Sequence, residues 1–207
     1  MAQLDANFSF EKATKADDIA RIAKYIHLTD PYIYPAICLD PMDLDWQQFI
    51  AQCFSQPNNL FSADHIFTAK HRGEIIGIAC MVPCGVPLQF HKEFEIPYAL
   101  QAGFDQNWSG YFCPLLEETK QTTGYNLTNI CIDEAYRGKG IGAKLLEYCI
   151  DTFSSHTIHL DVIEENKNAV TMYEAHGFTA TTRYQGFAGG EKILPCLHMT
   201  RQPNLVL

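Results

Sequence analysis

The sequence predicts a single domain of mixed α/β structure in which helices cross between the strands. Three observations lead to this prediction. The chain has 207 residues, a length that suits one domain. Segments that alternate between apolar and polar residues, as strands do, take turns with segments whose apolar residues recur at helical spacing. A glycine-rich stretch, residues 138–142, joins one such strand to one such helix. We therefore expect residues 1–207 to form one domain.

The first half of the chain is expected to form a strand, two helices and a hairpin. The alternation of residues 8–12 predicts the strand, and apolar periodicity predicts helices over residues 13–28 and 44–54. Thr14 or Asp17 is placed to cap the first helix. The stretches "DHIFTAK" and "EIIGIACMV" predict two strands, and the glycine of "HRGE" between them favours a tight turn.

The second half contains the more regular patterns. The stretches "YNLTNICI", "TIHLDVI", "FTATTRY" and "LPCLHMTR" predict four strands. Helices are expected over residues 142–153 and 168–176, the second ended by Gly177. Before this half, residues 83–124 carry aromatic residues among glycines and prolines without a clear period, although a short helix is expected within 112–122. So long an irregular segment is typical of a functional excursion.

Composition excludes several classes of protein. With 15 Lys and Arg against 24 Asp and Glu, the net charge is −9, which argues against a general nucleic-acid binder. No apolar run reaches the ~20 residues of a membrane span, and the first residues lack the apolar core of a secretory signal. The 8 cysteines lie mostly in apolar runs without a CxxC motif. They predict reduced thiols in the cytoplasm, with neither disulfides nor a metal site.

The stretch "YRGKGIG" has the composition of an anion-binding site. Amide groups at a helix N-terminus have no partners within the helix, and glycines allow a phosphate to approach them closely. Arg137 and Lys139 add two positive charges. The alternative interpretation is a tight turn with solvated cations. We therefore interpret the stretch as a site for phosphate or pyrophosphate.

Two common phosphate-binding motifs fit the stretch less well. A Walker A loop is excluded because GxxxxGK[ST] is absent. The spacing of Gly138, Gly140 and Ala143 formally matches a dinucleotide-binding motif, with Asp161 as its acidic residue. However, the intervening "DEAYR" separates these glycines from the preceding strand, and the chain downstream is too short for a full dinucleotide fold.

Two motifs in the second half resemble those of the GNAT superfamily, the Gcn5-related N-acetyltransferases. The stretch "ICIDEAYRGKGIGAKLLE" is similar to the family motif (Q/R)-x-x-G-x-(G/A), which Arg137, Gly140 and Gly142 match. The stretch "LDVIEENKNAVTMYEAHGF" resembles the motif that follows it in the family. The matching residues there are Leu160, Val162, Asn166, Ala169, Tyr173, Gly177 and Phe178. The resemblance is clear over about residues 124–180 and looser before them.

The resemblance implies a GNAT-like mixed central sheet with flanking helices, in which two parallel strands splay apart to form an acyl-CoA cleft. These strands would be "TNICI" and "IHLDVI", and the co-substrate would be acetyl-CoA. Asn166 would bind the pantetheine arm, a role compatible with capping a helix. Main-chain groups would bind the rest of the cofactor. The arm would contact Ile130, Cys131 and Ile132, and the pyrophosphate would contact Arg137, Gly138, Lys139, Gly140, Ile141 and Gly142.

The resemblance also implies an acyltransferase that moves an acetyl group to a primary amine by direct attack in a ternary complex. Tyr173 would protonate the departing thiolate, although a purely structural tyrosine is the alternative. Asp161 is the candidate base, with His159, Glu164 or water as alternatives. Cys131 is disfavoured as a nucleophile because it lies in a buried strand.

The acceptor is expected to be a small-molecule or protein amine, with no nucleic-acid or membrane partner. Negative charge favours cationic acceptors such as polyamines, aminoglycosides or lysine side chains. We expect the segment 83–124 to cover the acceptor side, where Tyr32, Tyr34, Trp108 and Tyr111 would line a pocket. Many relatives are dimers, so a homodimer is one expected arrangement. The alternative function is a non-catalytic, acetyl-CoA-binding or sensing module with the GNAT fold.

Overall fold

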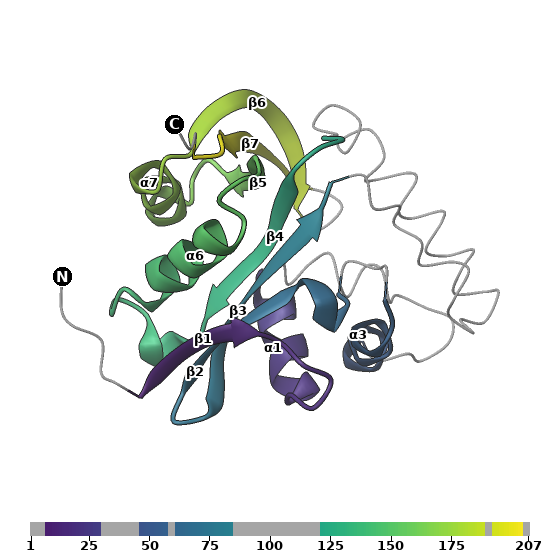
Figure 1. The fold of residues 1–207 in the computed structure, drawn as a ribbon. Coiled ribbons are helices and arrows are strands. Elements are labelled where there is room, and N and C mark those ends of the chain that lie inside the picture. Colours follow the sequence, from purple (N-terminus) through teal and green to yellow (C-terminus); the bar gives the residue numbers. More distant parts are fainter. Residues whose placement is uncertain (1–6, 30–45, 58–60, 85–120, 189–191, 205–207) are drawn as a thin grey trace, which may run out of the picture.

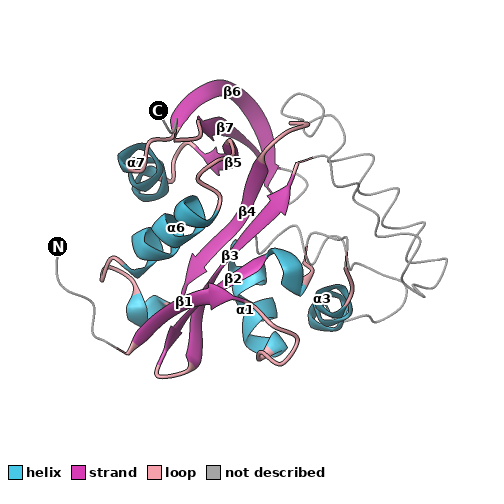
Figure 2. Cartoon of the chain, in the orientation of Figure 1, coloured by secondary structure: helices cyan, strands magenta, loops and turns pink. Residues whose placement is uncertain are grey.

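The computed structural model describes residues 7–29, 46–57, 61–84, 121–188 and 192–204. In this part the chain forms a 7-stranded sheet with the strand order β1-β2-β3-β4-β5-β7-β6. One neighbouring pair is parallel and the others are antiparallel. Helices lie on both faces of the sheet (Figures 1 and 2). The predicted mixed sheet with flanking helices is therefore confirmed.

The antiparallel part of the sheet starts with β1 (Phe8–Lys12), β2 (Ile66–His71) and β3 (Glu74–Pro83). A short 3-10 turn, η1 (Ala63–His65), leads into β2. The two residues between β2 and β3, Arg72 and Gly73, both have positive φ, at 51° and 81°. Such a turn matches the twist of the strands that it joins, which explains the predicted hairpin.

The parallel pair consists of β4 (Tyr125–Ile132) and β5 (Ile158–Ile163). β4 also pairs with β3, and β5 also pairs with β7 (Lys192–Arg201), both antiparallel. The edge strand β6 (Thr179–Ala188) forms a hairpin with β7. As a result, the last strand of the chain lies inside the sheet and not at its edge.

Among the described residues, two helices lie on each face of the sheet. On one face lie α1 (Ile19–Thr29) and α3 (Trp46–Ser55), and on the other lie α6 (Ile141–Thr152) and α7 (Lys167–Ala175) (Figure 1). Each pair covers its own cluster of buried apolar side chains. α6 and α7 are the connections that lead out of β4 and β5, so the ends of these two strands determine where the helices begin.

The first helix starts later than predicted. It begins after Asp18, whose Oδ1 accepts a hydrogen bond from the main chain of Arg21 at 3.2 Å. Asp17 does not cap the helix, because its carboxylate accepts from the main chain of Thr14 and pairs with Lys70 at 2.6 Å. The expected start at residue 13 and the expected cap were therefore wrong, because a tertiary ion pair takes the carboxylate.

Several sequence-based expectations lie outside the described residues. They include residues 85–120 of the predicted acceptor-side segment and the four aromatic candidates, Tyr32, Tyr34, Trp108 and Tyr111.

The described cysteines form no disulfide bond. They are Cys53, Cys80, Cys84, Cys131, Cys149 and Cys196. Within the described ranges, no group of three or more His, Cys, Asp or Glu side chains is arranged to hold a metal ion. Among the helices of these ranges, none has the length and apolar character needed to cross a membrane.

Candidate active site

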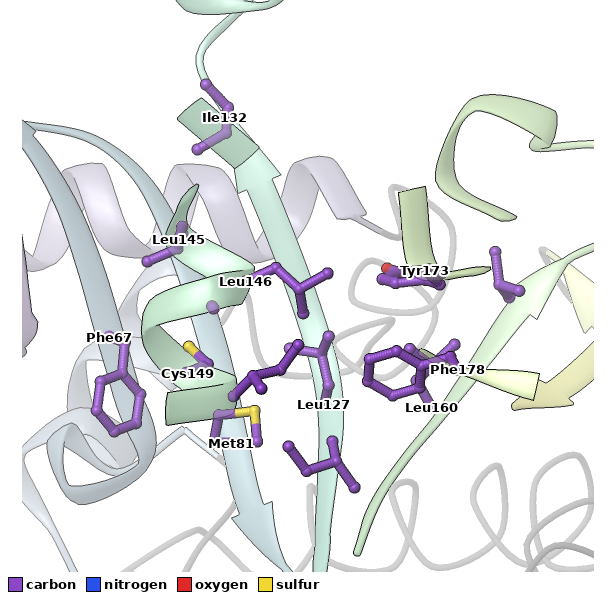
Figure 3. Close-up of a cluster of buried hydrophobic side chains, with 14 of the residues drawn as sticks. Phe67, Met81, Leu127, Ile132, Leu145, Leu146, Cys149, Leu160, Tyr173 and Phe178 are labelled. Atoms are coloured by element: carbon purple, nitrogen blue, oxygen red, sulfur yellow. The ribbon is translucent and has the colours of Figure 1, made fainter. Parts of the chain in front are cut away.

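The parallel strands β4 and β5 separate after their first two residues. In the described sheet they pair only where Tyr125 lies opposite Ile158 and Asn126 lies opposite His159. Figure 3 shows the two strands close together at one end and diverging beyond it. From Leu127 onwards β4 keeps β3 as its neighbour on one side, but it has no ladder partner on the side of β5. Main-chain groups on that side are therefore available to a ligand.

A β-bulge accompanies this separation. Cys80 pairs with Asn129 and Met81 pairs with Leu127, so that Thr128 is the extra residue on β4. A bulge bends its strand and increases the local twist. It thereby turns β4 away from β5 where the strands part.

The bulge also changes which side chains of β4 face each layer of helices. Leu127 and Ile130 both pack on the cluster beneath α6. Asn129 lies on the other face, where its Nδ2 donates to Oγ1 of Thr29 in α1 at 2.5 Å. Cys131 lies on that face too, and burial raises the pKa of its thiol. A protonated, buried thiol is a poor nucleophile, in agreement with the sequence-based expectation.

The glycine-rich loop connects the end of β4 to α6. Gly138 and Gly140 have φ values of 74° and 78°, which only glycine adopts readily. Gly140 is the residue that precedes the first turn of α6, and no side chain caps that turn. A Cβ atom at either glycine would meet nothing within 4 Å. The outer side of the loop is therefore open in front of the uncapped helix N-terminus.

The two cations of the loop bind their own main chain. Arg137 Nε donates to the carbonyl of Ile132 at 3.0 Å, and the Arg137 amide donates to Glu134 at 3.2 Å. Lys139 Nζ donates to the carbonyl of Ala135 at 3.0 Å. In this arrangement the cations shape the loop and contribute a positive field. The donors that remain for an anion are the amides at the start of α6.

Aromatic contacts brace the loop from the side of β2. The hydroxyl of Tyr136, in the 3-10 turn η2 (Glu134–Tyr136), lies 3.1 Å from His71 Nδ1. Lys139 Nζ lies 5.0 Å from the centre of the Tyr136 ring, and Phe8 stacks on His71. The loop is thus held in place before any ligand arrives.

Asp133 ties the same loop to α1. Its carboxylate accepts hydrogen bonds from the amide of Ala135, from the hydroxyl of Tyr25 at 3.0 Å and from Nζ of Lys24 at 3.3 Å. These donors, the amide of Ala135 first, hold the pKa of Asp133 below its usual value. The end of β4 is therefore anchored to the helix on the opposite face from α6.

α7 begins at Asn166, whose Oδ1 accepts from the amide of Ala169 at 3.3 Å. The capping role considered from the sequence is confirmed. Capping uses the carbonyl oxygen of the side chain, so the Nδ2 group is left for other acceptors. The role of Asn166 at a pantetheine arm stays a prediction.

Tyr173 lies on the buried side of α7, between β4 and β5. It is 6% exposed and packs edge to face against Phe178, with ring centroids 5.7 Å apart. Its hydroxyl is directed toward β4 (Figure 3). Burial raises the pKa of Tyr173 to about 12. The hydroxyl therefore stays protonated at neutral pH and is able to donate a proton or a hydrogen bond into the gap.

Asp161 lies on the opposite face of β5, where one side chain from β7 and one from β6 bind its carboxylate. His198 on β7 places Nδ1 2.9 Å from Asp161 Oδ1. Tyr184 on β6 also hydrogen-bonds the Asp161 carboxylate, and burial together with this contact raises the pKa of Tyr184. Asp161 was predicted from the sequence, but neither His198 nor Tyr184 was. The alternation of "LPCLHMTR" places His198 on one face of its strand, but not opposite Asp161.

The two other candidate bases are occupied. His159 is buried, with Nδ1 3.2 Å from Oγ1 of Thr200 and a second hydrogen bond to the main chain of Thr123. Burial lowers the pKa of His159. Glu164 pairs with Arg183 at 2.7 Å. Both fit structural roles.

A sequence model of the acetyltransferase (GNAT) family matches residues 34–178. The chain belongs to this family. The family match covers both motifs and the strands that part between them. The resemblance inferred from the two motifs is thus confirmed.

Curated relatives match the chain over shorter stretches. The N-alpha-acetyltransferase RimI of Mycobacterium tuberculosis is 35% identical over 54 residues, which are 26% of this chain and 34% of that protein. The spermine/spermidine N(1)-acetyltransferase of Bacillus subtilis is 32% identical over 69 residues, which are 31% of this chain and 45% of that protein. The chain therefore spans less than half the length of each of these two relatives.

Solved acetyltransferases resemble the whole chain. One acetyltransferase crystal structure superimposes with a TM-score of 0.64 at 20% identity, covering 95% of this chain and 100% of the other. A putative acetyltransferase of Salmonella typhimurium, solved with its cofactor acetyl-CoA, has a TM-score of 0.54 at 18% identity, covering 96% and 95%. At such identities the similarity establishes a shared fold.

Proposed function

We propose that this protein is an acetyl-CoA-dependent N-acetyltransferase that moves an acetyl group to a primary amine by direct attack in a ternary complex. The observation that carries the proposal is the gap between β4 and β5, which has Tyr173 between the strands and an open, glycine-lined helix N-terminus at its end. Membership of the GNAT family supports it.

The cofactor would lie along this gap. Amide groups at the start of α6, in the loop from Gly138 to Gly142, would bind the pyrophosphate, whose charge the helix dipole favours. Main-chain groups of residues 130–132 would bind the pantetheine arm and polarise the thioester carbonyl, and Asn166 would add its Nδ2. The carbonyl of Ile132 is bound by Arg137, so its neighbours would supply most of these contacts.

Tyr173 would protonate the CoA thiolate as it leaves. The buried, protonated hydroxyl that is directed toward β4 has the donor character this step requires. On the opposite face of β5, Asp161 would act in removing the proton from the acceptor ammonium. Asp161 is the exposed member of a hydrogen-bonded pair with His198, so the pair is the natural unit for that step.

The acceptor would be a cationic amine. The relatives are named for acetylation of α-amino groups and of spermine or spermidine, and both classes arrive as ammonium ions. The net charge of −9 favours such acceptors electrostatically.

Calorimetry with acetyl-CoA, with CoA and NADH as controls, tests the cofactor site. We expect binding of both CoA species in the micromolar range and none of NADH, because the loop serves a CoA pyrophosphate. Failure to bind either CoA species would refute the proposal. Turnover with spermidine and with a peptide that has a free N-terminus then tests catalysis. Tight binding of acetyl-CoA without acetylation across a wider amine panel would favour the non-catalytic sensing module.

A further inference from the structure

The sheet face opposite α6 and α7 carries an imidazole–carboxylate pair in which the imidazole is buried and the carboxylate is exposed. Asp161 and His198 lie directly opposite each other in the β5–β7 ladder, and Nδ1 of His198 lies 2.9 Å from Oδ1 of Asp161. His198 is 3% exposed, whereas the side chain of Asp161 is 43% exposed. A buried imidazole therefore supports a carboxylate that solvent reaches.

This hydrogen bond determines the tautomer of His198. An ionised carboxylate only accepts hydrogen bonds, so Nδ1 carries the hydrogen and Nε2 of the neutral ring carries a lone pair. Nε2 is buried and has no hydrogen-bond partner among the described residues. Leaving a buried polar atom unpaired costs about 1–3 kcal/mol. A histidine with this cost and a single polar contact is poorly explained by a structural role.

The neighbouring imidazole provides a contrast within the same cluster. His159 stacks on His198 with ring centroids 5.6 Å apart, and its ring bonds both Thr200 and the main chain of Thr123. Among the described residues, Tyr184 on β6 and Cys196 on β7 are further titratable groups near the pair. Of the two histidines, only His198 combines a carboxylate partner with a free nitrogen.

We infer that Nε2 of His198 accepts the proton of the acceptor ammonium, and that Asp161 is a positioning residue which orients the ring and stabilises the imidazolium. The inference rests on the proposed function. An imidazole is intrinsically a stronger base than a carboxylate, and histidine is the side chain that most often acts as a general base. The arrangement of base and orienting carboxylate is one that nucleophile-activating sites use widely.

The reaction would proceed by proton transfer, attack and loss of the thiolate. The ammonium N–H bond breaks and its proton goes to Nε2, which gives an imidazolium paired with the Asp161 carboxylate. The freed lone pair on nitrogen attacks the thioester carbonyl. The C–S bond then breaks, and Tyr173 gives its proton to the departing thiolate. The second proton that the nitrogen loses on becoming an amide restores the Tyr173 hydroxyl. The exposed carboxylate draws the cationic acceptor to this face before the transfer.

NMR of the imidazole nitrogens tests the tautomer without any acceptor. In the free protein at neutral pH we expect His198 to carry its hydrogen on Nδ1, and the His198→Gln variant assigns the resonance by its loss. Asp161→Asn should abolish this preference for Nδ1. A neutral His198 with its hydrogen on Nε2 would overturn the inference, because that nitrogen could then accept no proton.

Kinetics test the proton transfer. With spermidine as the probe, wild-type kcat/KM should fall at acid pH, because a protonated imidazole cannot act as a base. His198→Gln keeps the bulk of the side chain and should lose about 100-fold in kcat/KM together with this acidic limb. The affinity for acetyl-CoA should stay unchanged. Added imidazole should restore activity to His198→Ala, in which a ring-sized space is opened.

His159→Gln is the matched control, because it removes the stacked histidine that already has its hydrogen bonds. It should change kcat/KM less than about tenfold and keep the acidic limb. The inference would be overturned if His198→Gln acetylated spermidine as fast as the wild type. It would also be overturned if His159→Gln, and not His198→Gln, lost the acidic limb of the kcat/KM profile. Absence of acetylation by the wild type counts against the proposed function, and the NMR result still decides the state of His198.

Discussion

The two faces of β5 differ in chemistry although they alternate along one strand. Ile158, Leu160 and Val162 face α6 and α7 and belong to the apolar cluster there. His159 and Asp161 face the other way, into hydrogen bonds with β7. Side chains of a strand alternate between its two faces. This six-residue strand therefore presents buried apolar side chains on one face and titratable side chains on the other. Under the proposed function, the apolar face would lie toward the cofactor and the face with the titratable groups toward the acceptor.

The two faces also differ in the kind of polar group that each one presents. On the face with α6 and α7, the polar groups near the gap are the main-chain amides of the glycine loop, the capping side chain of Asn166 and the hydroxyl of Tyr173. The opposite face has them in side chains, such as Asp161, His198 and Tyr184. Changes at the glycine loop, at Asn166 and in the apolar side chains of β5 should therefore alter cofactor binding and stability. Changes at Tyr173 and on the second face should alter proton transfer.

The largest effect is expected at the glycine loop. Gly140→Asp places an anion where the pyrophosphate would lie, at a site with open space around it. We expect the affinity for acetyl-CoA to fall at least about 100-fold, since two like charges at contact distance repel by several kcal/mol at a protein surface. Gly140→Asn is the control, because it has the same shape and tolerates the positive φ but is neutral. Calorimetry on both variants makes the comparison. Equal affinities for the two would remove the loop from the cofactor site.

The next largest effect is a loss of folding stability when an apolar side chain on the buried face of β5 is truncated. Leu160 is 2% exposed, whereas Ile163 on the same strand is 38% exposed. We expect Leu160→Ala to lower the free energy of unfolding by about 2–5 kcal/mol, because a cavity opens in the core. Ile163→Ala should lower it by less than about 1 kcal/mol. Urea denaturation measures both, and similar losses in the two variants would contradict the assignment of the faces.

Tyr173→Phe should affect turnover and not binding. Removal of the hydroxyl takes away the proposed proton donor, so kcat should fall about 100-fold while the dissociation constant of acetyl-CoA changes little. The pKa of Tyr173 is raised to about 12. The hydroxyl therefore stays protonated, and its ionisation should not lower wild-type kcat below pH ~10. Steady-state kinetics across pH, together with calorimetry, check both points. Unchanged kcat would leave Tyr173 a structural role only.

The smallest effect separates the two roles of Asn166. Asn166→Ser keeps a good helix cap but removes the amide group that would reach the pantetheine arm. Asn166→Ala removes both. We expect Asn166→Ala to lose about 1 kcal/mol of stability and Asn166→Ser almost none, while both bind acetyl-CoA more weakly. Thermal unfolding and calorimetry distinguish these results, and full affinity in the Ser variant would limit Asn166 to capping.

Local elements were predictable because they depend on nearby residues. The strand over "YNLTNICI" and the hairpin turn at Gly73 appear where expected. So does the end of α7, where Gly177 adopts a positive φ of 84° and its amide binds Glu174. The start of α1 was not predictable, because Asp17, a good cap by type, binds Lys70 from β2 instead.

The sequence by itself determined the family and the glycine loop, since both reside in contiguous motifs whose residue types carry the chemistry. The tertiary structure decided how the polar face is assembled. His198 meets Asp161 across 37 residues, through a ladder register that no local pattern encodes. The parting of β4 from β5 depends on a bulge at Thr128, which is visible only once β3 is paired beside it. Side-chain chemistry is local, but which groups share a face depends on strand order and register.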